Sequence, residues 1–276
     1  MSVDSAVTSE LSPLLADDEQ PVFEVLNGEA GGRVLLICDH AANAVPRALD
    51  DLGLPHLELR RHIGWDIGAA AVTRHLVELM DAPAMLTRYS RLVVDCNRAP
   101  EHASLTPEIS DLTEVPGNRG ISDAERRSRM AALYDPYHAE IDRQIDRLTA
   151  VSGVAPVLVS IHSFTPVMDG FERPWEIGIL WNQDARLPLP LIDRFREDAS
   201  LTVGDNEPYT ARDGFGYTLD THGDGRGLAN ALIELRQDLI DTDHGARDWA
   251  ARVKAALDAV LDDPALYKAQ PPGAAV

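Results

Sequence analysis

Short runs of apolar residues alternate along this chain with longer segments that carry apolar side chains at helical spacing. Most of the short runs are apolar throughout, as expected for strands covered on both faces of a sheet. The predicted strands are residues 33–38, 84–87, 91–95, 156–161, 176–181, 201–204 and 231–235, and the predicted helices are residues 65–80, 122–148, 188–199 and 244–262. This alternation predicts an α/β fold whose parallel or mixed sheet has helices on both faces.

Nothing along the chain divides it into separate units, since it has no internal repeat, low-complexity segment or linker. A single α/β domain over residues 21–268 is predicted, long enough to bury about three quarters of the surface that the unfolded chain exposes. The acidic residues 1–20 predict a flexible N-terminal segment, and the Pro-rich residues 269–276 are expected to fray. Residues 99–120 hold several Pro and Gly residues with little periodicity, which predicts a long loop.

The excess of acidic residues restricts the kinds of partner. The chain has 45 Asp and Glu against 25 Lys and Arg, a formal net charge of −20. Binding to nucleic acid or to anionic membranes depends on clustered cations, so neither is predicted. The sequence contains no long apolar run and no signal-peptide pattern, and Cys38 and Cys96 cannot form a disulfide framework. A cytoplasmic protein, monomeric or a small homo-oligomer, is therefore expected.

Polar residues follow several of the predicted strands. Ligands of open α/β sheets bind beyond the carboxyl ends of the strands, so these residues are candidates for a functional site. They are Asp39, His40 and Asn43 after the first strand, Asp95, Asn97 and Arg98 after the third, His162 after the fourth, and Glu234 and Arg236 at the last. Histidines at two separate strand ends, together with carboxylates, suit Zn²⁺ or a related divalent metal.

Each candidate also has a simpler explanation. A histidine is more often a surface residue or a hydrogen-bonded core residue than a metal ligand. Asp66, at the predicted start of a helix, would be favourable there through the helix dipole alone. Arg91 and Arg98 could be ordinary ion-pair partners in so acidic a chain. Glu234 is flanked by apolar residues, and an unpaired carboxylate there would cost several kcal/mol, so a cation or a metal-bound water is expected beside it.

At these residues the sequence resembles the N-formylglutamate amidohydrolase family. The matching segments are ICDHAANAVP (37–46), GWDIGA (64–69), SRLVVDCNR (90–98), SIHSFTP (160–166), EIGILWN (176–182), NEPYTARDGFGYTLDTHG (206–223) and IELRQDLI (233–240). They occur in the family's order and span most of the chain. The resemblance implies the phosphorylase and zinc carboxypeptidase type of fold, a three-layer sandwich with a mixed, mainly parallel sheet.

The resemblance also implies a role for individual residues. The metal ligands would be His40, His162 and a third residue, for which Asp66 is preferred over Asn43, since the carboxypeptidase pattern has Glu where this chain has Asn43. Glu234 resembles the general base of that fold, and Arg98 with Asn97 resembles the pair that grips the substrate carboxylate or polarises the carbonyl. The other implied substrate-binding residues are Arg91, His222 and Arg236. The loop 99–120, which carries Arg119, is a candidate lid.

The expected activity is metal-dependent hydrolysis of the C–N amide bond of an N-formyl or N-acyl amino acid such as N-formylglutamate, with Zn²⁺ or another divalent metal as cofactor. Two alternatives remain open. The first is a carboxypeptidase-like deacylase or peptidase that acts on another acyl amino acid. The second is a catalytically silent member of the fold that binds a small anion.

Overall fold

The structure is a computed structural model, and it describes residues 14–271. The greater part of the predicted flexible N-terminal segment, residues 1–13, and most of the predicted fraying tail, residues 272–276, lie outside the described residues. A seven-stranded sheet forms the centre of the molecule, in the order β1-β3-β2-β6-β11-β9-β10. Its strands are β1 (Phe23–Leu26), β2 (Val34–Cys38), β3 (Ala84–Thr87), β6 (Val157–Phe164), β9 (Ile177–Leu180), β10 (Val203–Asp205) and β11 (Asn230–Arg236).

Most neighbouring strands of this sheet are parallel, which confirms the predicted α/β class with a mixed sheet. β3, β2, β6 and β11 form a parallel block at its centre. β1 runs antiparallel to β3, and β9 runs antiparallel to β11 while β10 continues parallel to β9. The carboxyl ends of the four central strands therefore lie on one edge of the sheet.

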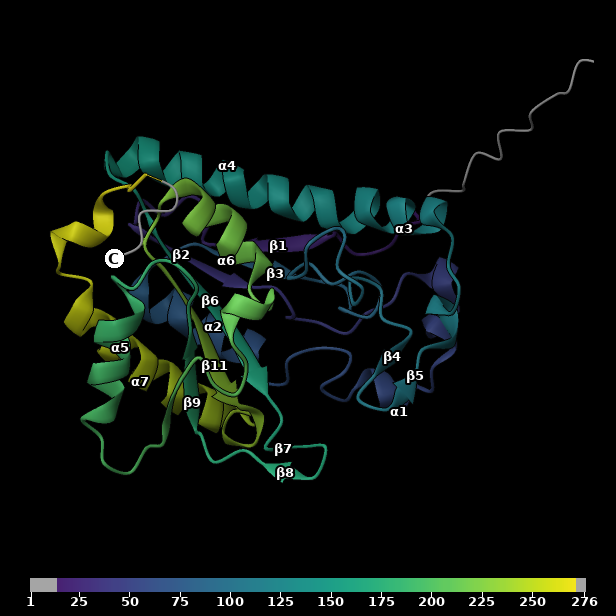
Figure 1. The fold of residues 1–276 in the computed structure, drawn as a ribbon. Coiled ribbons are helices and arrows are strands. Elements are labelled where there is room, and N and C mark those ends of the chain that lie inside the picture. The colour runs from purple at the N-terminus through teal and green to yellow at the C-terminus, as the bar shows by residue number, and fades with distance from the viewer. Residues whose placement is uncertain (1–13, 272–276) are drawn as a thin grey trace, which may run out of the picture.

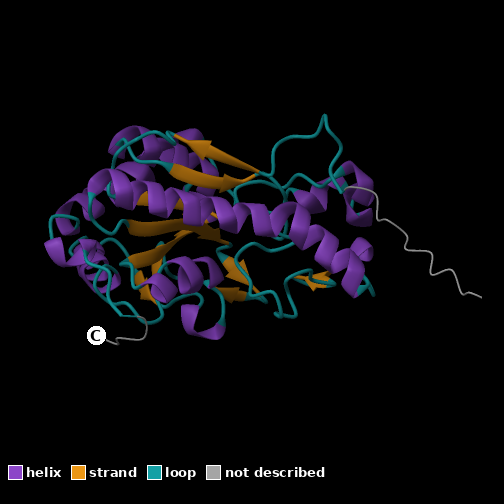
Figure 2. Cartoon of the chain, turned by 90° about the horizontal axis from the view of Figure 1, so that it is seen from above, coloured by secondary structure: helices purple, strands orange, loops and turns teal. Residues whose placement is uncertain are grey.

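Helices cover both faces of the sheet, as the uninterrupted apolar strands predict. One face is covered by α2 (Ala69–Met80), α5 (Pro188–Arg196) and α7 (Asp243–Val260), and the other by α4 (Asp135–Ser152) and α6 (Tyr217–His222). Within β2, Leu36 packs in the core beneath the first group, whereas Leu35 and Ile37 pack in the core beneath the second. Figure 2 shows the long helix α4 lying over one face of the sheet, and with helices on both faces the arrangement has three layers.

The long helix predicted from Ser122 is present but interrupted. Ser122 begins α3 (Asp123–Arg129) with the predicted capping box, in which its hydroxyl accepts from the Glu125 main chain and the Glu125 carboxylate accepts from the Ser122 main chain. A π-helical turn (Met130–Tyr134) then separates α3 from α4. Pro136 lies in the first turn of α4 and has no N–H to donate, which accounts for the break in the hydrogen-bond ladder.

The prediction of a strand over residues 91–95 is wrong, because residues 91–93 form a turn and residues 94–95 have no regular structure. Side chains from other segments satisfy two of the main-chain oxygens: Asn118 donates to the Leu92 oxygen and Arg129 to the Val93 oxygen. The segment is buried and apolar, and an apolar run of this length does not by itself distinguish a strand from a buried turn.

Two short hairpins project beyond the sheet (Figure 1). The predicted loop 99–120 contains the hairpin of β4 (Ile109–Ser110) and β5 (Thr113–Glu114), and a second hairpin joins β7 (Val167–Met168) to β8 (Phe171–Glu172). The remaining short elements are α1 (His56–Leu59) and 3-10 turns at Arg47–Gly53, Pro116–Asn118, Ala211–Asp213, Asp224–Arg226, Gln237–Leu239 and Pro264–Tyr267. Among the described residues, no helix has the length and apolar character needed to span a membrane.

Candidate active site

The carboxyl edge of the parallel strands carries a cluster of polar side chains. His40 lies two residues beyond the end of β2, and Asp66 lies in the turn that precedes α2. His162 lies inside β6, because this strand extends to Phe164, beyond the predicted end at residue 161. The parallel register of β6 and β11 pairs His162 with Glu234. Four residues that are distant in sequence are thereby brought to one edge of the sheet.

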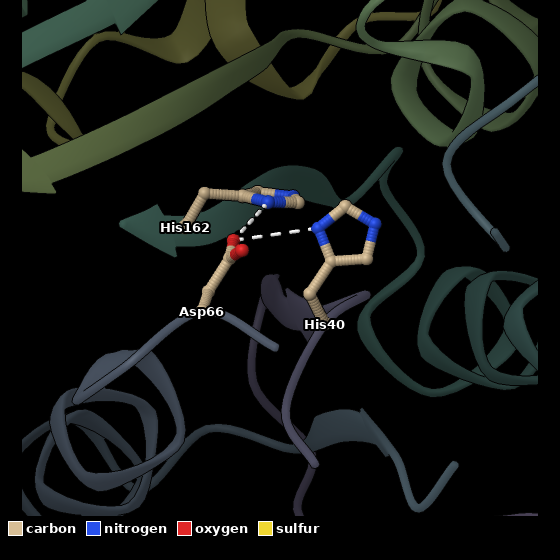
Figure 3. Close-up of side chains that lie close together, drawn as sticks. All are labelled: His40, Asp66 and His162. Atoms are coloured by element: carbon tan, nitrogen blue, oxygen red, sulfur yellow. Dashed lines mark hydrogen bonds and ion pairs between the residues drawn. The ribbon is translucent and has the colours of Figure 1, made fainter. Parts of the chain in front are cut away.

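His40, Asp66 and His162 converge on a single point. The Asp66 Oδ2 atom lies 2.8 Å from the His162 Nδ1 atom and 3.4 Å from the His40 Nδ1 atom. Figure 3 shows the carboxylate between the two imidazole rings. One ligand atom from each of the three side chains lies within 4.8 Å of the others, and all three residues are buried. The predicted ligands His40, Asp66 and His162 thus occur together in space.

Each imidazole ring also forms a hydrogen bond, through its Nε2 atom, to a second carboxylate. The His40 Nε2 atom lies 2.7 Å from an Asp95 oxygen, and the His162 Nε2 atom lies 3.1 Å from an Asp39 oxygen. Asp39 is itself held by the hydroxyl groups of Tyr137 and Thr218, which donate to it over 3.0 and 2.8 Å. When a carboxylate accepts a hydrogen bond from one ring nitrogen of a histidine, the lone pair of the other ring nitrogen is available to a metal. In both histidines Nε2 faces such a carboxylate and Nδ1 faces Asp66.

Local backbone geometry places Asp66 in the cluster. Its main-chain N–H donates to the His40 main-chain oxygen over 2.9 Å, and its carboxylate accepts from the Ser163 main-chain N–H over 3.2 Å. Gly68 then enters α2 with a φ of +83°, where an added Cβ would overlap the Ile240 main-chain oxygen. Only glycine combines this φ with so close an approach of another backbone segment.

The donor set fits a divalent cation. Without one, burial lowers the pKa of His162, but hydrogen bonds to Asp39 and Asp66 outweigh this and raise it to about 10. In this state the protonated His162 ring supplies a positive charge beside the Asp66 carboxylate. A cation at the same point would replace that proton. Two imidazole nitrogens and one carboxylate form the three-ligand set of catalytic zinc sites. Asn43 lies apart from this cluster, and its amide donates to the Leu59 main-chain oxygen over 2.9 Å.

Glu234 lies beside His162 and is buried, with 6% of its surface exposed. Its Oε2 atom has no hydrogen-bond partner among residues 14–271. Burial raises the pKa of Glu234 to about 7, although positive charge on His162 acts in the opposite direction. A carboxyl group with a pKa near neutrality and a free oxygen is suited to accept and release a proton.

Two arginines lie on the same edge of the sheet but differ in their pairing. The Arg91 guanidinium donates to Asp95 from Nε and Nη2, over 3.1 and 2.8 Å, and lies 3.4 Å from Asp66. Arg98 donates to the Asn97 main-chain oxygen over 2.8 Å and to the Ser104 hydroxyl over 3.3 Å, and it stacks on the Phe215 ring. Arg91 therefore neutralises carboxylates of the cluster, whereas the described partners of Arg98 are uncharged.

The structure does not bring every predicted site residue to this edge. His222 lies in a hydrogen-bonded group with His138 and Asp142 instead. Arg236 pairs with Asp238 and Glu176, and Arg119 is exposed and pairs with Glu114. Asn97 does lie at this edge, but the oxygen of its side-chain amide already accepts from the Thr218 main-chain N–H over 3.0 Å.

A cavity of about 280 Å³ opens beside the cluster. His40, Asp66, His162, Glu234, Arg91, Asp95, Arg98 and Asn97 all line it, so eight of the residues singled out from the sequence share one cavity. The segment 99–120 contributes Ser104, Pro107, Ile109, Ser110 and Asp111 to its wall. Other lining residues were not singled out from the sequence: they include His62, Met168, Tyr209 and Phe215.

Asp39 and Asp95, the carboxylates that contact the histidine Nε2 atoms, are recognisable in the sequence only as residues at strand ends, with no role that the sequence assigns to them. Asp39 directly precedes His40, and Asp95 directly follows a buried run, but neither position shows which histidine it would contact. The pairing of Asp95 with His40 joins residues 55 positions apart, and that of Asp39 with His162 joins residues 123 positions apart. The only available signal was the presence of a carboxylate at each strand end.

Comparison with known proteins identifies the family. The family model described as N-formylglutamate amidohydrolase matches residues 32–241. Among solved structures, the gene product Atu2144 from Agrobacterium tumefaciens is 40% identical, with a TM-score of 0.85 over 90% of this chain and 100% of that chain. N-formylglutamate amidohydrolase from Ralstonia eutropha JMP134 is 18% identical, with a TM-score of 0.53 over 87% of this chain and 96% of that one, and shares the fold. No curated protein sequence matches significantly.

Proposed function

The chain belongs to the N-formylglutamate amidohydrolase family, and we propose that it hydrolyses the amide bond of an N-formyl or other short N-acyl amino acid with a divalent cation held by His40, Asp66 and His162. The observation that carries this proposal is the convergence of the two histidine Nδ1 atoms and one Asp66 oxygen, with a carboxylate behind each ring. Imidazole and carboxylate donors favour Zn²⁺.

A bound divalent cation would supply Lewis acidity, which polarises the scissile carbonyl and makes water a stronger nucleophile near neutral pH. The chain's own contribution to proton transfer is Glu234. Its unpartnered Oε2 atom accepts the proton that the attacking water loses, and the protonated carboxyl then donates this proton to the departing amine nitrogen. Burial raises the pKa of this carboxyl above that of an exposed glutamate, which favours its role as proton acceptor and then donor.

Arg98 binds the carboxylate of the substrate in this proposal. Its guanidinium lines the cavity, and the ring of Phe215 and the Asn97 main-chain oxygen hold its plane in position. A planar guanidinium forms paired hydrogen bonds with a carboxylate, which a lysine cannot reproduce. Arg91 keeps Asp95 and Asp66 ionised, and this preserves the negative charge that the cation requires.

The test is metal content together with hydrolysis. Purified protein should retain about one zinc-like ion per chain, a stoichiometry set by a three-ligand site, and should release formate from N-formyl amino acids. His40→Ala and His162→Ala should lose both the ion and the activity. His244→Ala, whose side chain is exposed and does not line the cavity, is the matched control and should keep both. If both ligand variants retain the ion in full, the ligand assignment fails.

A further inference from the structure

Arg173 is a buried arginine that the proposed function does not use. It directly follows β8, and 7% of its surface is exposed. Its partners within residues 14–271 are uncharged: the guanidinium donates to the Thr165 main-chain oxygen over 3.3 Å and lies over the rings of Tyr209 and Phe164, 4.7 and 5.8 Å from their centroids. An arginine cannot lose its charge in a protein, and a buried charge without a counter-charge is costly. Arg173 therefore favours an anion that comes from outside the chain.

The contacts of Arg173 place it directly behind one side of the cavity. Phe164, Thr165 and Tyr209, which the guanidinium contacts, all line the cavity. The Arg173 main-chain N–H donates to the Pro166 main-chain oxygen over 2.8 Å, which closes the base of the β7–β8 hairpin against the end of β6. The positive charge of Arg173 thus lies one side-chain layer from the cavity. A guanidinium has five N–H donors, so the hydrogen bond to Thr165 leaves most of them for other acceptors.

A row of stacked side chains joins Arg173 to Arg98. The rings of Tyr209 and Phe215, both from the segment between β10 and α6, stack with their centroids 5.8 Å apart. The Arg98 guanidinium lies over the Phe215 ring, 4.6 Å from its centroid, and that of Arg173 lies over the Tyr209 ring. Both rings line the cavity. The stacked row (Arg98, Phe215, Tyr209 and Arg173) therefore sets two guanidinium groups with uncharged partners along the same wall.

The carboxylates of the cavity wall have other partners. Arg91 pairs with Asp66 and Asp95, and Arg61 pairs with Asp111 over 2.7 Å. The fourth lining carboxyl group is the proposed general base. The two arginines of the stacked row are thus left for anionic groups of a ligand, and a ligand with two carboxylates meets this requirement.

We propose that Arg173 is a specificity-determining residue, whose charge selects an N-acyl amino acid with a second carboxylate on its side chain. This inference rests on the proposed function and adds the residue that recognises the side chain. Arg98 pairs with the α-carboxylate, the amide bond lies at the proposed cation ligands, and the side-chain carboxylate lies against Tyr209, in front of Arg173. Because Arg173 is buried, water and salt screen its attraction for this carboxylate only weakly.

The first test compares N-formylglutamate with N-formylglutamine, which has the same shape but no charge on its side chain, on the metal-loaded enzyme. We expect kcat/KM to be higher for N-formylglutamate by about tenfold or more. Equal values, or a preference for N-formylglutamine, would overturn this inference, while the hydrolysis itself upholds the proposed function. If neither compound is hydrolysed, the proposed function fails. Calorimetric binding of both compounds then decides the side-chain preference alone: tighter binding of N-formylglutamate supports it, and any other order overturns it.

The second test removes the charge of Arg173. Arg173→Gln keeps a donor for the Thr165 oxygen but is neutral, so it should reduce the preference for N-formylglutamate over N-formylglutamine by about tenfold. The loss should appear mainly in KM, because this position does not touch the scissile bond. Arg173→Lys keeps the charge and should retain more of the preference. Arg212→Gln removes an exposed guanidinium that stacks on Trp181 outside the cavity, and as the matched control it should keep the wild-type preference.

A purely structural role for Arg173 gives a different result. If this arginine only anchors the β7–β8 hairpin to β6, Arg173→Gln lowers kcat/KM for both substrates by the same factor, and the inference is overturned. Circular dichroism shows whether the variant is folded. If it is not, the wild-type comparison decides: a preference for N-formylglutamate supports the second carboxylate, and its absence overturns the inference.

Discussion

His162 and Glu234 are neighbours on adjacent strands, and each has an unusual affinity for protons. Two carboxylates hold a proton on His162 and raise its pKa to about 10, while burial raises the pKa of Glu234 to about 7. A divalent cation at Nδ1 would expel the first proton, and its charge would stabilise the ionised form of Glu234. Cation affinity should therefore weaken as the pH falls, because protons compete for the same nitrogen.

At this scale the decisive variant is Glu234→Gln. An amide cannot accept the proton of the attacking water, so kcat should fall by about 10²- to 10⁴-fold. Metal content, measured by elemental analysis, should remain unchanged because Glu234 is not one of the three proposed ligands. Glu197→Gln removes an exposed carboxylate near the end of α5 and serves as the control. Wild-type kcat in Glu234→Gln would exclude Glu234 as the general base.

At the scale of elements, a row of hydrogen bonds joins α4 to α6. The His138 and His222 rings stack with their centroids 5.1 Å apart, and the His138 Nδ1 and His222 Nε2 atoms lie 2.8 Å apart. The His222 Nδ1 atom lies 2.9 Å from an Asp142 carboxylate oxygen, and the His138 Nε2 atom lies 3.0 Å from the Cys96 main-chain oxygen. Burial, together with positive charge on His222, lowers the pKa of His138 to about 4. This connection also holds the turn that positions Asp95 and Asn97.

The depressed pKa of His138 predicts a loss of stability in mild acid. Between about pH 6.5, where an unfolded histidine takes up a proton, and pH 4, the unfolded chain binds a proton that the folded chain excludes. The free energy of unfolding should thus fall as the pH is lowered through this window. Between pH 7 and pH 5 this residue contributes a loss on the order of 2 kcal/mol. Urea unfolding at both pH values measures the effect.

The matched variant for this measurement is His138→Gln, which does not titrate. Its free energy of unfolding should depend less on pH over the same interval than that of the wild type. His244→Gln, which replaces an exposed histidine, should retain the wild-type dependence. If His138→Gln and the wild type lose stability in parallel between pH 7 and pH 5, the protonation of His138 is not responsible.

At the scale of the whole molecule, the net charge of −20 opposes both folding and the approach of an anionic substrate. At the candidate site the negative charge is locally reduced, because Arg91 and Arg98 line the same cavity as the proposed cation ligands. Many of the remaining ion pairs lie at the surface, where a single pair contributes little to stability. The long-range repulsion therefore remains largely uncompensated except by salt.

Salt should stabilise this protein. Raising NaCl from about 20 to 300 mM shortens the Debye length from roughly 20 to 6 Å and should increase the free energy of unfolding by on the order of 1 kcal/mol. Urea unfolding near pH 7 measures this difference. Near pH 4.7, the isoelectric point expected from the sequence, the same change in salt should have a much smaller effect. A decrease in stability with salt at pH 7 would show that attractive ion pairs outweigh the repulsion.

The periodicity of the chain was sufficient to predict the α/β class, the sheet strands 84–87, 156–161 and 231–235 and most of the helices, because these depend on local patterns of apolar residues. It also predicted that His40, His162 and Glu234 would follow or occupy strands. Local patterns failed at residues 91–95, where Asn118 and Arg129 satisfy the backbone and replace a strand ladder. Strand β1 was not predicted, since its four residues are only half-buried.

The sequence by itself determined which residue types stand at the strand ends, and therefore the kind of chemistry that this edge of the sheet can support. Only the tertiary structure decided which of them meet. It placed Asp66, and not Asn43, between the two histidines. It brought Asp39 and Asp95 to the Nε2 atoms of the rings. His222 and Arg236 do not line the cavity. The physical reason is that strand order and register, which bring distant segments together, depend on packing between elements and not on the pattern within any one of them.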